Sequence, residues 1–214
     1  FLLFRTFLLL NYASSLELLQ KLVKQSNENF ATEMLSKLIN ESRASNVNFI
    51  NSRNEIVENF LRLHRLKIAI EIEDFDKVCV AESRKIRTAV ISINSFSDFE
   101  KFHKLIKPVL FHYDGHFVIL FENANIDEIE KIFSMLWKMY IFNVNVLVPN
   151  EDTTSMFTFQ PFINNSCGNT KAIKINEFDG KSMKWSTDVF FPEKFHNLYD
   201  CSLRIGSFVN NPAF

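Results

Sequence analysis

Two histidines near an aspartate form a group of potential metal ligands in the middle of the chain. His112 and His116 flank Asp114 and Gly115 in the segment HYDGH. A four-residue spacing places two imidazoles on one face only if the segment is helical. Here the segment leads into an apolar run that is typical of a strand. We therefore predict a turn in which Gly115 has a positive φ, and no metal site.

Other kinds of site lack the residues that they require. The four glycines are isolated from one another, which excludes the glycine-rich turn that binds dinucleotides. A Gly-x-Ser-x-Gly motif around a nucleophilic serine is also absent from the sequence. The acidic run IEIEDFD at 70–76 is typical of a solvated strand end, with cation binding as the alternative. The sequence therefore predicts neither catalytic residues nor a cofactor.

The three cysteines lie in different surroundings. Cys79 lies in the apolar segment KVCVA, which is typical of a small buried side chain. Cys167 and Cys201 lie in polar segments rich in turn residues. If they pair, the disulfide closes a loop of about 35 residues and stabilises the fold by about 4 kcal/mol. Asn40 and Asn164 begin glycosylation sequons, and together these features favour the secretory pathway.

Hydrophobic periodicity predicts the elements that must position these residues. Apolar spacings near three and four predict a helix within 15–40, and alternation in LKIAIEI at 66–72 predicts a strand with one buried face. Strands at 88–93, 116–122 and 143–149 then alternate with helices at 95–106 and 125–140. Asn125 is the expected N-cap of the second of these helices. Strands that alternate with helices over short connections predict a parallel sheet with right-handed crossovers.

The predicted fold class is α/β, with a Rossmann-like, mostly parallel sheet, flanking helices and a β-rich C-terminal extension. Residues 15–150 form the α/β domain, and 151–202 form the extension and a linker. Within the extension, SMFTFQPF and AIKINEF are expected to join the sheet or to cover its edge. Residues 1–14 are either the end of a signal peptide or a first helix.

Composition limits the remaining function classes. The chain has 214 residues, of which 47% are hydrophobic, and its net charge is −1. That balance provides no general attraction to nucleic acid or to an anionic membrane surface. Its apolar stretches fall short of the roughly 20 residues that a membrane-spanning helix requires. Because the chain begins with Phe and stops soon after a new alternating run starts, we interpret it as part of a longer protein.

A set of segments in the second half of the chain resembles a known receptor family. The segments are YDGHFVILFE, IFSMLWKMYI, NVNVLV, FTFQPF, SCGN, INEF and FFPEKFHNLYDCSLRIGSF. The last contains a pattern of family residues in order: Phe191, Pro192, Lys194, Asn197, Leu198, Cys201, Leu203 and Arg204. Together they resemble the extracellular N-terminal region of insect ionotropic receptors, divergent chemosensory relatives of ionotropic glutamate receptors. Ser202 departs from the pattern, which often has proline there, and this leaves the receptor subtype open.

The resemblance implies a role and a place for the chain. It implies that Cys167 and Cys201 are joined, and that residues 203–214 begin a truncated ligand-binding clamshell. The residues before it would form an extracellular, non-catalytic platform without a tight small-molecule site, and the ligand-binding residues are unknown. The complete receptor would be a ligand-gated ion channel of the plasma membrane, with a small-molecule chemosensory ligand and co-receptor or sister subunits. The alternative is a cytosolic α/β binding or regulatory module with free thiols and without catalytic activity.

Overall fold

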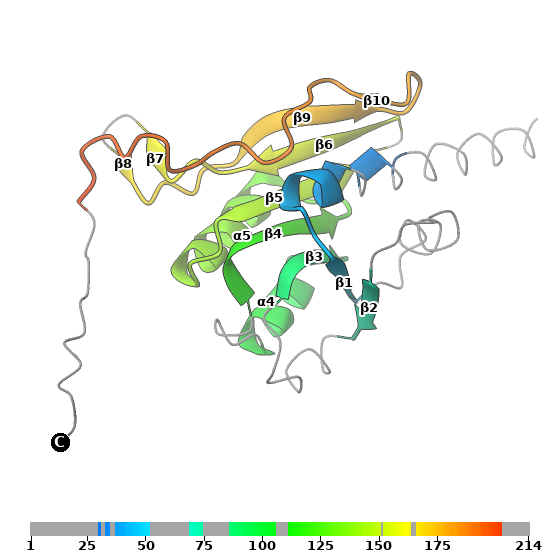
Figure 1. Ribbon diagram of the computed structural model, residues 1–214, viewed down its shortest axis with the longest axis horizontal. Helices are drawn as coiled ribbons and strands as arrows, with labels where there is room; N and C mark the ends of the chain where they lie inside the picture. Colours follow the sequence, from blue (N-terminus) through cyan, green and yellow to red (C-terminus); the bar gives the residue numbers. More distant parts are fainter. Residues whose placement is uncertain are drawn as a thin grey trace, which may run out of the picture.

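The computed structural model describes residues 30, 33–34, 37–51, 69–74, 86–105, 111–150, 152–163 and 166–202. Within them, one mixed sheet has the strand order β10-β9-β6-β5-β4-β3-β1-β2 (Figure 1). Its parallel strands are β1 (Asn46–Ile50), β2 (Ala69–Glu73), β3 (Ile86–Ile93), β4 (Phe111–Phe121) and β5 (Asn143–Pro149). Its antiparallel strands are β6 (Thr153–Thr158), β9 (Ile173–Asp179) and β10 (Lys184–Trp185). A separate antiparallel pair consists of β7 (Phe162–Ile163) and β8 (Ser166–Cys167).

Helices cover both faces of the sheet (Figure 1). Helices α4 (Phe96–Leu105) and α5 (Ile126–Lys138) pack on one face, in a buried cluster that includes Ile91 of β3. The helical residues at 30, 33–34 and 37–42 pack on the other face, in a second cluster that includes Val90. Val90 and Ile91 thus point to the clusters on opposite faces of the sheet, because successive side chains alternate between the two faces along a strand. The mostly parallel α/β fold with an antiparallel C-terminal part is confirmed.

The predicted helices agree closely with α4 and α5. The Asn125 side chain accepts a hydrogen bond from the Glu128 backbone N–H at 2.9 Å, and the Glu128 carboxylate accepts one from the Asn125 N–H at 3.3 Å. This capping box satisfies two amides at the start of α5. In the predicted helix at 15–40, the described residues Phe30, Met34 and Leu38 are helical and buried; residues 15–29 lie outside the described part.

Two strand predictions need correction. Strand β2 is present, but Ile72, assigned to a buried face, is 57% exposed. The first parallel strand, β1, was not predicted. Its sequence NVNFI places Asn48 in the interior, at 2% exposure, where the side-chain amide donates to the Glu71 carboxylate at 2.9 Å. A polar residue that is buried with its partner interrupts the hydrophobic pattern from which strands are predicted.

The predicted turn at HYDGH is wrong, because the segment is an irregular part of β4. Ile86 of β3 pairs with Phe111, whereas Thr88 pairs with His116, so extra residues of β4 bulge between these pairs. Gly115 is not among the residues with positive φ. A Cβ atom at Gly115 would instead lie 2.7 Å from the Arg87 carbonyl oxygen and 2.5 Å from the Phe117 ring. Glycine is therefore required here by close approach of the backbone.

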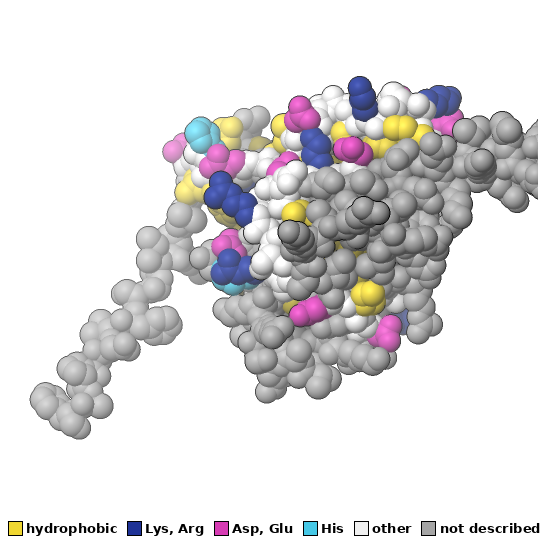
Figure 2. Space-filling model, turned by 45° about the vertical axis from the view of Figure 1, so that its right-hand side comes forward, with side chains coloured by type: hydrophobic (Ala, Val, Ile, Leu, Met, Phe, Trp, Pro, Cys, Tyr) yellow, Lys and Arg dark blue, Asp and Glu magenta, His cyan; other side chains and the backbone are white. Residues whose placement is uncertain are grey.

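Basic and acidic side chains lie near one another on the described part of the surface (Figure 2). Figure 2 shows lysine and arginine side chains interspersed with acidic side chains on the face that it draws. This distribution agrees with the net charge of −1. Among the described residues, no helix is both long and apolar enough to cross a bilayer.

Candidate functional site

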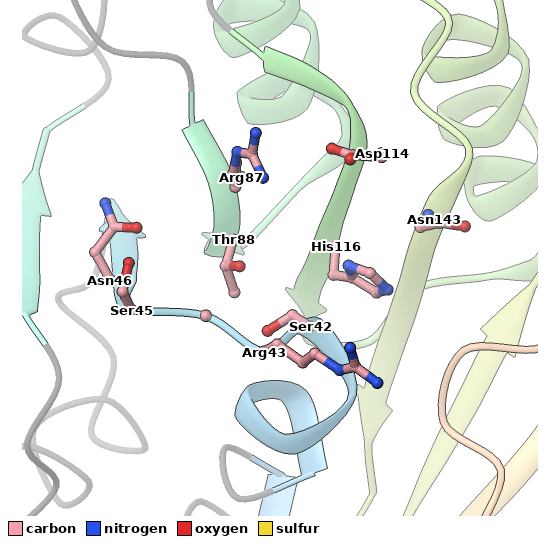
Figure 3. Close-up of a pocket in the computed structure, with 10 residues that line it drawn as sticks. Ser42, Arg43, Ser45, Asn46, Arg87, Thr88, Asp114, His116 and Asn143 are labelled. Carbon is pink, nitrogen blue, oxygen red and sulfur yellow. The ribbon is translucent and has the colours of Figure 1, made fainter.

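A polar pocket of about 360 Å3 lies where the parallel strands begin (Figure 3). We call it the amino-edge pocket. It is lined by Ser42, Arg43, Ala44, Ser45, Asn46, Arg87, Thr88, Asp114, His116 and Asn143. These residues come from a helix end, from the starts of β1, β3 and β5, and from the bulge of β4. Parallel strands begin at the same edge of a sheet, so segments far apart in sequence meet there.

One wall of the pocket is a row of polar residues on three neighbouring strands. His116 of β4 is in register with Thr88 of β3 and with Asn143 of β5. Residues in register on adjacent strands lie about 5 Å apart with their side chains on the same face. Thr88 is 1% exposed, and Asn143 is half-buried. Both residues line the pocket.

Arg43 faces this wall from the end of the preceding helix. The helical residues end at Ser42, and Arg43 takes a left-handed conformation with φ of 50° before the chain turns into β1. That conformation usually belongs to glycine or asparagine and costs an arginine about 1–2 kcal/mol. In Figure 3 the Arg43 side chain extends from the helix end to a position below the His116 ring. The described residues provide no carboxylate partner for its guanidinium.

The other charged groups of the pocket are engaged with each other through His112. The Arg87 Nη2 atom lies 3.4 Å from His112 Nε2, and His112 Nδ1 contacts the Asp114 carboxylate. Burial lowers the pKa of His116, although the nearby Asp114 acts in the opposite direction. The two histidines of the HYDGH motif thus contact different residues. His112 contacts Arg87 and Asp114, whereas His116 packs against Phe191. The described residues hold no cluster of three potential metal ligands.

The segment 187–202, which we call the C-terminal strap, runs from the end of β10 past the pocket. The Glu41 carboxylate accepts hydrogen bonds from the backbone N–H groups of Phe190 and Phe191 at 3.2 and 2.9 Å. The Asn145 side chain donates to the Phe190 carbonyl oxygen at 2.6 Å. The Phe191 ring packs edge-on against His116, with 4.7 Å between the ring centroids. The strap is therefore in contact with both the helix end and a wall of the pocket.

Comparison with known families decides the assignment. The family model described as "Putative ionotropic receptor, ligand binding domain" matches residues 37–197. The chain belongs to this ionotropic receptor family. No curated protein and no solved structure has significant similarity to it. The matched region includes the amino-edge pocket and most of the C-terminal strap, and the family is one of non-catalytic receptor domains.

The domain boundary at residue 203 stays a prediction. We expected the ligand-binding domain of the ionotropic receptor to begin at residue 203, after a platform without a tight ligand site. The matched family model carries the name ligand-binding domain and covers residues 37–197. All residues that line the amino-edge pocket lie inside this range.

Lys194 of the receptor motif is buried in the molecule. At 2% exposure, its Nζ donates to the Phe142 carbonyl oxygen at 2.7 Å and to the Thr158 hydroxyl at 2.8 Å. The ammonium group also lies 4.1 Å from the centroid of the Phe159 ring. Burial lowers the pKa of Lys194 to about 7. The sequence pattern contained this lysine but offered no sign of its burial, because lysine is rarely buried.

The other motif residues shape the end of the strap. The Phe191 ring packs against the His116 ring, and Pro192 is the next residue of the strap. Asn197 accepts a hydrogen bond from the Tyr199 N–H at 2.8 Å, and the Leu198 carbonyl accepts one from the Cys201 N–H at 2.9 Å. These bonds form the turn that leads to the cysteine. Leu203 and Arg204 lie outside the described residues.

The structure joins the two cysteines whose pairing the resemblance implies. Cys167 of β8 and Cys201 of the strap form a disulfide, with their Cα atoms 5.7 Å apart. Gly168, next to Cys167, has φ of 77° and lies against the Trp137 indole. Of the two sequons, Asn40 is exposed on the helix before the pocket. Asn164 and Cys79 lie outside the described residues.

Proposed function

We propose that this chain is an extracellular, non-catalytic, ligand-receiving region of a ligand-gated, ion-channel-type chemosensory receptor. The observation that carries the proposal is the family match over residues 37–197. The Cys167–Cys201 disulfide supports an extracellular position, because such bonds persist in oxidising compartments. We place the complete receptor in the plasma membrane, with this region outside the cell and with co-receptor or sister subunits as partners.

The contacts between pocket and strap suggest how ligand binding would be transmitted. A ligand moves a receptor between two states only by as much as it prefers one of them. Arg43 of the pocket lies two residues after Glu41, which holds the backbone of Phe190 and Phe191. A ligand that fixes the helix end would therefore also favour one position of the strap. The strap is the route by which this domain would act on the rest of a receptor.

Export and oxidation of the chain provide a direct test. Produced in a secretory host, the chain should be recovered from the medium with Cys167 linked to Cys201 in non-reducing peptide maps. Endoglycosidase should reduce its mass, and Asn40→Gln together with Asn164→Gln should remove that change. Retention inside the cell with both thiols free would contradict the proposal and would favour the cytosolic module.

A platform for subunit contact is a second candidate function. It is favoured by large apolar side chains that are exposed on the strap and near the end of α5, namely Tyr140, Val189, Phe195 and Tyr199. Exposed aromatic side chains are common anchors in protein interfaces. In a receptor that contains this chain, Tyr140→Ser should then reduce co-purification with sister subunits. A loss of ligand response with unchanged co-purification would instead favour the ligand-receiving role.

A further inference from the structure

We propose that the C-terminal strap is a conformational latch, which detaches while the sheet stays folded and which closes when the Lys194 side chain inserts beneath it. The inference rests on the proposed function, because the strap is the route by which this domain would act on the rest of a receptor. Three observations carry it: the kind of bonds that hold the strap, the small number of its buried side chains, and a buried ammonium group without a counter-ion.

The strap is held by side chains of other elements. Asn176 of β9 donates to the carbonyl oxygens of Thr187 and Val189 at 3.0 and 2.9 Å. Glu41 and Asn145 bind further backbone groups of the strap, as described above. None of its residues belongs to a helix or a strand. A segment without the ladder of a strand can open locally at a lower free energy than the sheet beneath it.

Few side chains of the strap are buried. Among its residues, only Phe190, Lys194 and Cys201 are buried. The disulfide of Cys201 is covalent, so it tethers the end of the strap whether the strap is closed or detached. Lys194 is therefore the one buried side chain that holds the part of the strap between Phe190 and the tether.

The buried ammonium group makes closure dependent on protonation. Lys194 Nζ bonds to a carbonyl oxygen and a hydroxyl and lies over the Phe159 ring, but among the described residues no carboxylate pairs with it. Neutral partners only partly offset the loss of hydration of a charge. Burial accordingly lowers the pKa of Lys194 from 10.5 to about 7. Protonation therefore favours the detached strap, and the closed strap gains stability as pH rises from about 7 toward 10.5.

Other titratable groups also face the strap. His116 packs on Phe191, and burial lowers the pKa of His116, so its ring is neutral above pH 7. The ion pair with Lys37 lowers the pKa of Asp188. Glu41 contributes its carboxylate to the strap backbone. The groups that contact the buried ammonium are a carbonyl, a hydroxyl and a phenyl ring, which do not titrate. Exposed titratable residues of the strap itself are Glu193, His196, Tyr199 and Asp200.

Hydrogen exchange of the secreted, disulfide-bonded chain tests this inference. Exchange is measured by mass spectrometry at pH 7 and pH 9 and is corrected for the intrinsic dependence of exchange on pH. We expect protection of strap amides at 190–201 to increase about tenfold or more between these pH values. Amides of β4 and β5 should remain better protected than the strap at both pH values.

Variants assign the pH dependence to one side chain. Lys194→Met removes the titrating amine, so its strap should have the same protection at pH 7 and pH 9. Lys184→Met, at an exposed position of β10, should retain the wild-type increase. Thr158→Val keeps the lysine but removes one acceptor of its Nζ, and should speed exchange of the strap about fivefold.

Two results would overturn the inference. One is a wild-type strap that exchanges no faster than β5 at either pH, since the strap would then open only when the whole domain unfolds. The other is a Lys194→Met protein with the wild-type change between pH 7 and pH 9. If Lys194→Met does not fold, unchanged strap exchange in Thr158→Val replaces the second result. The receptor function is judged separately, by the secretion and disulfide mapping described above.

Discussion

Lys194 shows how a single buried charge can define the pH response of the domain. It is a residue of the C-terminal strap, and its side chain points inward to the Phe142 carbonyl, the Thr158 hydroxyl and the Phe159 ring. Within the described structure, no carboxylate pairs with its ammonium group. Burial therefore lowers the pKa of Lys194 from 10.5 to about 7. A neutral amine can still donate both hydrogen bonds.

The lowered pKa predicts that stability rises with pH. Between pH 7 and about 10 the unfolded chain binds a proton at Lys194 that the folded chain lacks, so the free energy of unfolding increases with pH. The increase should approach about 1 kcal/mol per pH unit. Urea unfolding at pH 6, 7, 8 and 9 measures it. Lys194→Met should lose this part of the slope, whereas the exposed Lys104→Met should retain it; equal slopes in all three proteins would refute the prediction.

Gly115 is required by the close approach of β4 to β3. Because a Cβ atom would lie 2.7 Å from the Arg87 carbonyl oxygen, Gly115→Ala must displace one strand. We expect a loss of about 1–3 kcal/mol in the free energy of unfolding, as for overpacked sites. Chemical denaturation measures the loss, and Ser97→Ala at an exposed position of α4 serves as the control. A Gly115→Ala protein as stable as the control would show that the bulge adapts.

At the scale of elements, the disulfide fixes the end of the strap to β8. Replacing both Cys167 and Cys201 by serine should lower the free energy of unfolding by about 3–4 kcal/mol on the chain-entropy estimate. The strap should also detach more often, which would expose the peptide bond after Lys194 to trypsin. Cleavage after Lys181, in the exposed turn between β9 and β10, provides an internal reference. If the ratio of the two cleavage rates stays constant, the disulfide does not hold the strap in place.

At the scale of the whole molecule, Glu41 connects the pocket to the strap. Its carboxylate binds two backbone amides across a separation of about 150 residues. Glu41→Gln replaces these charge-assisted bonds by weaker neutral ones, so hydrogen exchange at Phe190 and Phe191 should become about tenfold faster. Mass spectrometry or NMR measures the exchange. Glu33→Gln, on an exposed position of the same helix, should leave it unchanged, and equal exchange in both variants would remove Glu41 from the proposed route.

The sequence by itself determined the elements whose evidence is local. Short runs of apolar, β-branched residues define β3 and β5, and the capping residues Asn125 and Glu128 define the start of α5, because these patterns depend only on residues that are close in sequence. The motif from Phe191 to Cys201 similarly indicates the receptor family from the sequence alone.

The tertiary structure decided which distant residues meet. Arg43, Thr88 and Asn143 form one pocket only because β1, β3 and β5 begin at the same edge of the sheet. The bulge at Gly115 and the burial of the Lys194 side chain, which anchors the strap, likewise depend on strand register and long-range packing. Register and packing arise from contacts between segments that are far apart in the chain. Local hydrophobic periodicity therefore does not predict them.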